Sequence, residues 1–488
     1  MVEEKIIYLG NKKQLFIDNR WFQQANGVSL RVNPPVKRER VLVPEKPWEA
    51  FRIGAGTSII EDEGVYRMWY DAIAPRPPEA DHVCRNRFLC YAESDDGLHW
   101  ERKNVNLFTW QGIEENNIVV PGGQGGIMKD PTGSDEHRYK GLLRVWPNDL
   151  WEESQGAVAP YWETEETFCN ESELYICSSP DGIQWHRHGA VSDHFHDTHN
   201  HLIYDPDLGC HVAYVRTHER GRTVGRLEVE DPMDTPWVPL EKNGGDPAGA
   251  FDTVLMRDDY DPPETDLYTP CVHHYPWADD AYFSFTTPYR HYPVGRNQGL
   301  VDIQLAVSRD GKEFHRPDRR PYVRLGREGA WDAGMLYMCL GMIRHGDEIW
   351  MYYSGTESIH GGAEQSSADY EGGIARVVQR LDGFVSADAD YTGATFTTPL
   401  LRFSGDQLEL NIDCSALGEA WVEFRDEQGR PIPGYSLDEA VSVDGNRIAA
   451  PVRWEGKDSV AELAGRPVRM HVKLRACKLY AFQFAGDA

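Results

Sequence analysis

The sequence predicts an all-β protein, with a five-bladed β-propeller followed by a C-terminal β-sandwich. The first observation is a stretch that occurs three times in similar form, as YAESDDGLHWER at 91–102, YICSSPDGIQWHR at 175–187 and QLAVSRDGKEFHR at 304–316. Each copy is a strand-like run that ends in Ser, turns at Asp-Gly and resumes at an aromatic residue, and Asp-Gly between such runs is typical of a hairpin. Weaker copies at 231–240 and 379–387 bring the total to five.

The second observation is a further unit that precedes each of these copies. It consists of a strand, a short turn and a strand rich in aromatic and β-branched residues. Its five copies lie at 57–72, 125–145, 201–216, 270–287 and 338–355. The two units together give four strands per repeat, and four-stranded antiparallel repeats are the blades of a propeller. We therefore predict a five-bladed propeller over residues 46–390.

The segments on either side of the propeller differ in character. Residues 1–45 contain a strand-like run, KQLFIDNRWF, and a Pro-rich extended stretch, which we expect to pack against the propeller. Residues 391–488 contain short alternating runs such as LELNID, AWVEFRD and LYAFQF, separated by turn sequences such as EQGRPIPG. Short alternating strands with regular turns are typical of a β-sandwich, which we predict for this segment.

Composition narrows the class of partner. The chain has 488 residues and a net charge of −28, which argues against a nucleic acid or an anionic membrane as the partner. No apolar run approaches the roughly 20 residues of a membrane span, and the start, MVEEKIIYLG, lacks the basic and apolar regions of a signal peptide. The nine cysteines are scattered without a CxxC pair, which favours reduced thiols. We expect a cytoplasmic protein.

Loop lengths predict which face of the propeller carries the site. The loops between the second and third strands of four blades are long, at 72–87, 147–172, 287–300 and 354–372. Long loops on a rigid scaffold usually carry function, and the innermost strand of each blade begins on the same face. The residues at or just before these starts are Trp48 and Glu49 in blade 1, Asp197, His199 and Asn200 in blade 3, Asp266 and Tyr268 in blade 4, and Trp331 and Asp332 in blade 5.

Three aspartates thus converge from consecutive blades. Buried carboxylates that repel one another are costly for structure alone, but they suit acid/base chemistry because neighbouring charges and desolvation separate their pKa values. An aspartate at a strand start also satisfies backbone amides, which is the structural alternative for each of them. The run HFHDTHNH at 194–201 is a second alternative, since Asp197 and His199 share one side of a strand and could reach one metal ion.

The repeats resemble those of a known group of enzymes. The five blades, the S-x-D-G-x-x-W turns at 94–100 and 179–185 and the trailing sandwich resemble the five-bladed propeller glycosidases of glycoside hydrolase families 32, 43, 62 and 68. Bacterial proteins labelled family 32-like show patterns similar to Trp48-Glu49, ENNIV at 115–119, Asp197 to Asn200, and WDAGM at 331–335. The resemblance implies glycoside hydrolysis by carboxylates. Families 32 and 43 place their acids in the first three blades, whereas here they fall in blades 3 to 5.

We therefore predict a glycosidase that removes a terminal sugar in an axial pocket. Asp197 and Asp266 are the first catalytic pair, with Asp332 or Glu49 as the third acid. The residues expected to bind the carbohydrate are His199, Asn200, Tyr268, Trp331, Arg52, His360 and Trp48. No cofactor is required, although the axial channel of such a propeller has room for a structural Ca²⁺.

Three alternatives remain open from the sequence. A non-catalytic carbohydrate-binding propeller would keep the aromatic residues and not need the paired acids. Sialidase-like chemistry would need an arginine triad, for which Arg52, Arg144 and Arg216 are available, together with a Tyr–Glu pair. A metal-assisted carbohydrate lyase or hydrolase would need His196 and His199 to bind one ion with distant residues.

Overall fold

The computed structural model describes residues 5–75, 87–145, 173–192, 196–197, 199–219, 221–238, 250–293, 298–361 and 371–486. Within these ranges the fold is all-β, as predicted: every helical element is a three-residue 3₁₀ turn. These turns are η1 (Asn19–Trp21), η2 (Pro47–Glu49), η4 (Asp135–His137) and η6 (Ala461–Leu463). No helix in the described ranges is long and apolar enough to span a membrane. Much of the four predicted long loops (76–86, 146–172, 294–297 and 362–370) lies outside the described residues.

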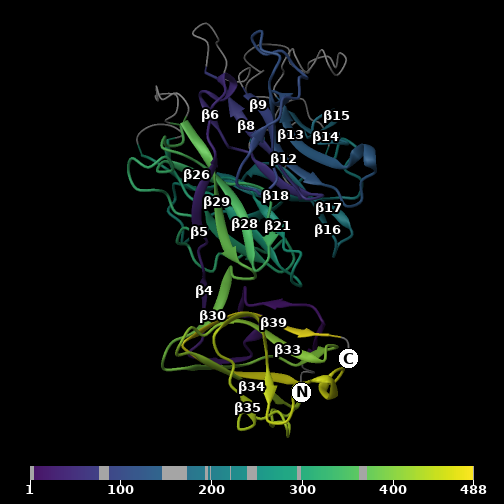
Figure 1. The fold of residues 1–488 in the computed structure, drawn as a ribbon, viewed down its shortest axis with the longest axis vertical. Helices are drawn as coiled ribbons and strands as arrows, with labels where there is room; N and C mark the ends of the chain where they lie inside the picture. Colours follow the sequence, from purple (N-terminus) through teal and green to yellow (C-terminus); the bar gives the residue numbers. More distant parts are fainter. Residues whose placement is uncertain are drawn as a thin grey trace.

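Figure 1 shows a larger body above a smaller one. The strands of the larger body are grouped here in chain order into five successive units, which are mainly antiparallel. Hydrogen bonds join units 1 and 5 and part of unit 4 in one 14-stranded sheet. Unit 1 contains β6 (Arg52–Ile53), β7 (Ser58–Asp62), β8 (Val65–Ile73), β9 (Arg87–Ser94), β10 (Glu101–Arg102) and β11 (Ile118–Pro121). Unit 2 contains β12 (Gly123–Lys129), β13 (Tyr139–Val145), β14 (Glu173–Ser179) and β15 (His186–Ser192). Unit 3 contains β16 (His201–Asp205), β17 (Cys210–His218), β18 (Arg222–Val229) and β19 (Asp252–Leu255).

Units 4 and 5 follow the same plan with interrupted strands. Unit 4 contains β20 (Thr265–Leu267), β21 (Val272–His274), β22 (Tyr282–Thr286), β23 (Pro288–His291), β24 (Gly299–Val301) and β25 (Gln304–Ser308). Unit 5 contains β26 (Met335–Met338), β27 (Ile343–His345), β28 (Glu348–Thr356) and β29 (Glu371–Arg380). The second strand of a unit, such as β28 with the sequence EIWMYYSGT, is buried almost throughout. Strands buried on both faces need such continuous apolar runs.

The Ser-x-Asp-Gly repeats form one recurring turn, as predicted. In the first copy Ser94 Oγ accepts the Gly97 N–H at 2.9 Å, and Asp96 Oδ1 accepts the N–H groups of Leu98 and His99, both at 2.8 Å. The copies at 179–184 and 308–313 repeat these bonds. The turn is therefore built from contacts within six residues.

An aromatic side chain of the preceding unit holds each of these turns. The glycine carbonyl accepts a hydrogen bond from a tryptophan or tyrosine in the second strand of that unit. The bonds run from Trp69 Nε1 in unit 1 to Gly182 O (2.6 Å), from Tyr214 OH in unit 3 to Gly311 O (2.9 Å) and from Tyr352 OH in unit 5 to Gly97 O (2.9 Å). The last of these joins the fifth unit to the first.

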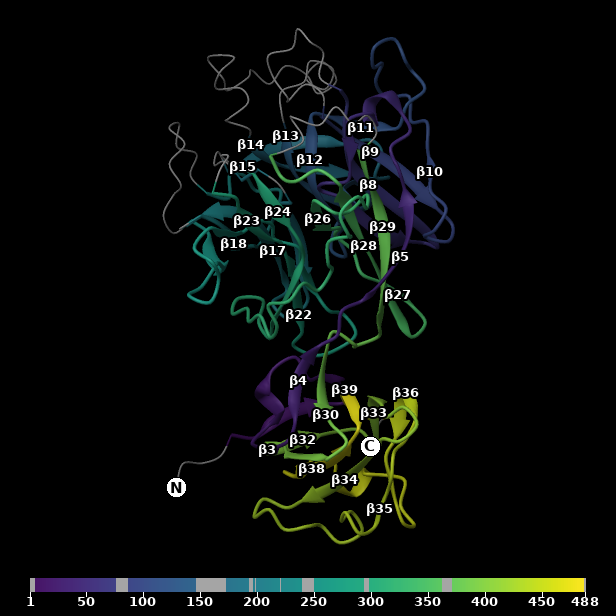
Figure 2. The same cartoon turned by 90° about the vertical axis from the view of Figure 1, so that its left-hand side faces the viewer.

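The outer strand of unit 5 differs from the prediction. The sequence assigns 379–387 to this unit, but the strand after that Asp-Gly turn, β30 (Val385–Ala389), pairs with β39 (Cys477–Ala485) and β4 (Ser29–Val32) in the smaller body. Its place beside β29 is taken by β5 (Val36–Leu42) from the N-terminal segment. Figure 2 shows β5 running up from the smaller body alongside β29. The exchange covers a sheet edge that would otherwise be open.

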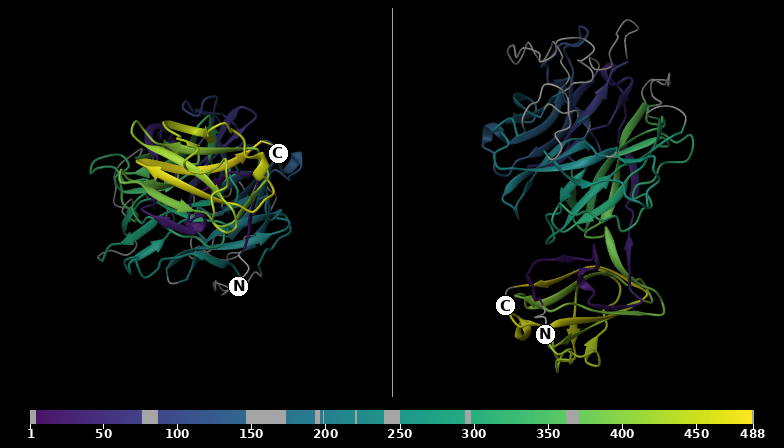
Figure 3. Two further views of the ribbon diagram at one scale, coloured as in Figure 1. Left: turned by 90° about the horizontal axis from the view of Figure 1, so that it is seen from below. Right: turned by 180° about the vertical axis from the view of Figure 1, so that it is seen from behind.

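The smaller body combines both ends of the chain (Figure 3). One sheet has the order β36-β33-β39-β30-β4, with β2 also on β39, and another has the order β3-β31-β38-β34. The N-terminal strands are β1 (Ile7–Gly10), β2 (Gln14–Leu15) and β3 (Gln24–Asn26). The C-terminal strands are β31 (Ala394–Thr397), β32 (Leu401–Phe403), β33 (Gln407–Asp413), β34 (Glu419–Arg425), β35 (Ala440–Val441), β36 (Asn446–Pro451), β37 (Arg453–Trp454) and β38 (Arg469–Arg475).

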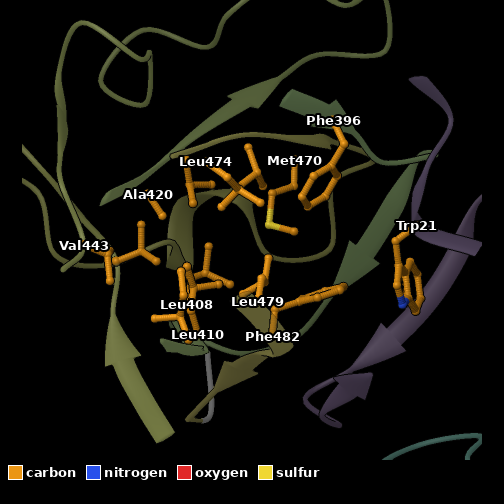
Figure 4. Close-up of a cluster of buried hydrophobic side chains, with 14 of the residues drawn as sticks. Trp21, Phe396, Leu408, Leu410, Ala420, Val443, Met470, Leu474, Leu479 and Phe482 are labelled. Atoms are coloured by element: carbon orange, nitrogen blue, oxygen red, sulfur yellow. The ribbon is translucent and has the colours of Figure 1, made fainter. Parts of the chain in front are cut away.

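The N-terminal strands thus pair with the C-terminal section, whereas we expected the whole segment against the larger body. Figure 4 shows Trp21 beside Phe482 in the apolar core of the smaller body, and their rings are 5.2 Å apart. Leu15 and Ile17 pack in the same cluster as Phe283 of the larger body. The backbone N–H and C=O groups of a strand need hydrogen-bond partners, and the N-terminal strands find them on the strands of the smaller body.

Candidate functional site

Charged side chains from four units and an aromatic side chain from the fifth meet in one cluster, called here the aspartate–arginine cluster. Its members are joined by the hydrogen bonds, ion pairs, ring contacts and electrostatic interactions described below. They are Arg52, Asp71, Arg87, Gln124, Arg144, Asp197, His199, Arg216, Arg222, Asp266, Tyr268, Tyr289, Tyr337 and His360. The cluster contains five arginines and three aspartates.

Asp197 lies between two arginines. Arg144 Nη1 is 2.5 Å from its Oδ1 and Arg216 Nη1 is 2.5 Å from its Oδ2, while the Tyr268 hydroxyl is 3.4 Å from Oδ2. Asp197 has a φ of +47°, a left-handed conformation that Asp tolerates, and Asn200 Nδ2 donates to its carbonyl at 3.3 Å. Burial opposes ionisation, but the guanidinium groups of Arg216 and Arg144 hold the pKa of this carboxyl well below its usual range. Asp197 is therefore a permanent anion.

Asp266 belongs to the same network. Its Oδ2 lies 2.7 Å from Arg222 Nη1 and 2.7 Å from His291 Nε2. Burial raises its pKa, but the bonds to His291 and Arg222 outweigh burial and leave the pKa lowered. The Tyr268 ring lies between the guanidinium groups of Arg216 and Arg222, 5.2 and 5.0 Å from the ring centre. The structure thus brings together the two acids that the sequence analysis placed first.

Asp71 was not predicted from the sequence. It lies near the end of β8 and is 1% exposed. Gln124 Nε2 donates to its Oδ2 at 3.1 Å and Arg87 Nη1 lies 3.5 Å away, while Oδ1 is buried without a hydrogen-bond partner. Burial raises the pKa of Asp71 to about 6, against the attraction of Arg87 and Arg52, and the charge of Asp197 raises it further. About one tenth of Asp71 is therefore protonated at pH 7.

Aromatic and imidazole rings line the cluster. His199 Nε2 accepts the Gly56 N–H at 2.9 Å, and its ring lies 5.3 Å from that of Tyr337. Burial lowers the pKa of His199 to about 3, so this histidine is neutral. The His360 ring lies 5.1 Å from Tyr268, as expected for a pair in one site. Planar rings of this kind pack against the apolar faces of sugars, as they pack against other apolar surfaces.

The other predicted acids have separate partners. Glu49 is fully buried and bonds to the Tyr70 hydroxyl at 2.6 Å and to Arg102 Nε at 2.8 Å. Asp332 accepts bonds from Lys37 Nζ at 2.6 Å and from the Tyr353 hydroxyl at 2.9 Å. Among the described residues no contact joins either acid to Asp197 or Asp266. Both tie distant strands together.

The two predicted tryptophans also have structural neighbours. Trp48 Nε1 donates to Asn117 Oδ1 at 2.9 Å. Trp331 stacks on Tyr353 with the ring centres 5.8 Å apart, and the Arg40 guanidinium lies 5.0 Å from its centre. Trp48 therefore belongs to the surroundings of Glu49, and Trp331 to those of Asp332. Neither tryptophan belongs to the aspartate–arginine cluster.

The metal alternative is not favoured by the histidine geometry. His196 Nδ1 lies 2.7 Å from the Arg216 carbonyl and its Nε2 lies 3.0 Å from Ser192 Oγ, so both ring nitrogens are engaged. His199 uses Nε2 for the Gly56 amide. Within the part of the chain that the structure describes, no group of three or more His, Cys, Asp or Glu side chains is arranged to hold a metal ion.

Comparison with known proteins gives only distant likenesses. No protein-family model and no curated protein matches the chain. Among solved structures it resembles a glycosyl hydrolase from Bacteroides ovatus at 15% identity, over 76% of this chain and 93% of that one, with a TM-score of 0.42. It resembles an N-acetylgalactosamine deacetylase from F. plautii, in complex with blood group B trisaccharide, at 12% identity, over 73% and 96%, with a TM-score of 0.45. A structure from the GH130 family, described as containing glycoside hydrolases that target β-1,2 mannosidic linkages in Candida mannan, is 17% identical over 76% and 99%, with a TM-score of 0.43.

Proposed function

We propose that the protein is a glycoside hydrolase whose larger body is a five-bladed β-propeller and whose smaller body is a β-sandwich. The five antiparallel units support the propeller, and so does the series of turn contacts, because Tyr352 of the fifth unit holds Gly97 of the first. In this arrangement the propeller runs from β5 to β29. The sandwich takes in β1 to β4 as well as the strands from β30 onward, so its boundaries differ from the predicted division at 46 and 391.

The observation that carries the proposed activity is a pair of carboxyl groups with opposite pKa shifts, of which Asp71 is buried and Asp197 is partly exposed. Burial raises the pKa of Asp71, whereas two arginines lower that of Asp197. Most glycosidases use two carboxyl groups in one site, one protonated and one ionised, and therefore need separated pKa values. Because Asp266 is also held ionised, the acid role that the sequence analysis gave to the Asp197–Asp266 pair passes to Asp71.

The proposed mechanism assigns one role to each carboxyl group. The protonated Asp71 carboxyl donates its proton to the glycosidic oxygen as the bond from that oxygen to the anomeric carbon breaks. The Asp197 anion faces the positive charge that develops on the sugar ring, and water completes the hydrolysis. Asp266 fixes Arg222, which in turn packs on the Tyr268 ring. We expect removal of a terminal sugar, because convergence of several units on one cluster favours an enclosed site over an open groove.

The test is a hydrolysis screen with aryl furanosides and pyranosides. We expect release of the aryl group from at least one of them. We expect Asp71→Asn and Asp197→Asn to reduce kcat/KM by about 100-fold or more on phenyl glycosides, whose leaving group needs a proton. Asp130→Asn is the matched control, since this buried aspartate bonds to His211 at 3.0 Å outside the cluster. Binding of sugars without cleavage would instead identify a carbohydrate-binding propeller. Full activity in both cluster variants would refute the assignment.

A further inference from the structure

We propose that the sugar cleaved by this protein carries a carboxylate, and that Arg52 binds it. The substrate class is then a uronoside, an acidic glycoside, rather than a neutral hexoside. This inference rests on the proposed glycosidase function and adds the chemistry of its substrate.

Four of the five arginines of the cluster lie beside an aspartate. Asp197 takes Arg144 and Arg216, and Asp266 takes Arg222. Arg87 lies 3.5 Å from Asp71. The aspartates of the cluster thus already have cationic neighbours. In the described part of the chain the fifth arginine, Arg52, has no carboxylate within ion-pair distance, although its charge acts on Asp71.

Arg52 differs from the other four arginines in its hydrogen bonding. In the described part of the chain its guanidinium makes no hydrogen bond or ion pair, and its Nε is buried without a partner. Its guanidinium carbon lies 5.9 Å from the centre of the Phe51 ring. Burial of an N–H group without an acceptor is costly, and an acceptor atom of a ligand would offset that cost.

The strand that carries Arg52 pairs with the strand that carries Asp71, the proposed acid. Arg52 lies in β6, hydrogen-bonded alongside β8, with its Cα opposite that of Ile73. Its charge lowers the pKa of Asp71 and that of the buried Tyr337 hydroxyl, which places it within electrostatic reach of both. A ligand group held by Arg52 would therefore belong to the same sugar whose bond Asp71 protonates.

A sugar carboxylate fits this site better than a free inorganic anion does. Guanidinium pairs best with planar carboxylates and with phosphates, through two parallel hydrogen bonds. Tyr268, Tyr337 and His360 lie in the same cluster and offer ring surfaces suited to a sugar body. A carboxylate attached to a sugar uses both features, whereas a free inorganic anion would use only the arginine.

The experiment compares substrates that differ at one group. Aryl glucuronides and galacturonides are assayed beside the matching glucosides and galactosides and beside the uronide methyl esters. We expect kcat/KM to be about 100-fold higher for the preferred uronide than for its neutral partners. Arg52→Gln should remove most of this preference, because it lowers kcat/KM for the uronide far more than for the neutral glycosides. Arg138→Gln, which alters an arginine bonded to Asp62 outside the cluster, is the matched control.

A second measurement does not depend on activity. Calorimetry with free glucuronate or galacturonate should show binding that Arg52→Gln weakens at least 10-fold, with glucose, galactose, phosphate and sulfate as comparison ligands. Tighter binding of phosphate or sulfate, or equal cleavage of neutral hexosides and uronides, would overturn the inference and leave the glycosidase proposal intact. Failure of the wild-type protein to cleave any glycoside would instead overturn the proposed function.

Discussion

The raised pKa of Asp71 makes a prediction about stability that needs no substrate. In the unfolded chain an aspartate has a pKa near 3.8, and in the folded protein that of Asp71 rises to about 6 because the side chain is buried. The folded state therefore binds this proton more tightly than the unfolded state does. The contribution of this proton to the free energy of unfolding is fully present below about pH 4, and it is lost as the pH rises from there through 6.

The magnitude follows from the shift of about two pKa units. At 1.36 kcal/mol per unit, ionised Asp71 costs about 3 kcal/mol of folding free energy at pH 7 and above, and only about 0.6 kcal/mol at pH 4. Asp71→Asn keeps the shape of the side chain and its bond to Gln124 but cannot ionise. We expect the variant to gain stability over the wild type between pH 4 and pH 7, by about 2 to 3 kcal/mol.

The assay is urea unfolding of both proteins at several pH values, followed by tryptophan fluorescence. The difference between the two unfolding free energies cancels the titration of all other groups. Asp197→Asn supplies a control of opposite sign: the pKa of Asp197 is lowered in the folded state, so its stabilising contribution is present at neutral pH and is lost in acid. A difference between wild type and Asp71→Asn that stays constant from pH 4 to pH 8 would refute the raised pKa of Asp71.

Three further predictions concern activity and packing. Asp71→Asn should lose activity toward alkyl glycosides but keep much of it toward dinitrophenyl glycosides, whose leaving group needs no proton; equal loss on both, in kcat/KM, would contradict the acid role. Asp332→Asn should keep wild-type kcat/KM within a few-fold, because its partners lie outside the cluster. Gly182→Ala should destabilise the protein by about 2 to 4 kcal/mol in thermal unfolding, since its Cβ would lie 2.5 Å from Trp69. Gly209→Ala, with a similar positive φ but open space around it, is the matched control and should cost about 1 kcal/mol.

The parts of the fold that the sequence predicted are those with local causes. The Asp-Gly turns at 94–99 close through bonds within six residues, so the residue types alone specify them. The strand that completes unit 5 has no such signal. β5 and β29 lie more than 300 residues apart, and the residues of β5 do not indicate which strand it pairs with. The same holds for Glu49 and Asp332, whose cationic partners come from other elements.

The candidate site was predicted in part for a similar reason. Asp197 and Asp266 stand at strand starts, where turn residues make an acid conspicuous. Asp71 stands inside the run MWYDAI, and an acid in an otherwise apolar strand is a signal that could have identified it. Its pKa depends on Gln124 and Arg87, which reach it from other strands. Only folding brings those groups to one place.

The interlacing of the two ends of the protein has a consequence for synthesis on the ribosome. β5 leaves the ribosome early, yet its partner β29 begins 329 residues later, which corresponds to a delay of roughly 15 to 65 s at 5–20 residues per second. β2 waits longer still, because its partner β39 follows β29 in the chain. Nascent copies of this protein therefore carry unsatisfied strand edges through most of translation, and chaperones that shield extended segments should bind its first 42 residues.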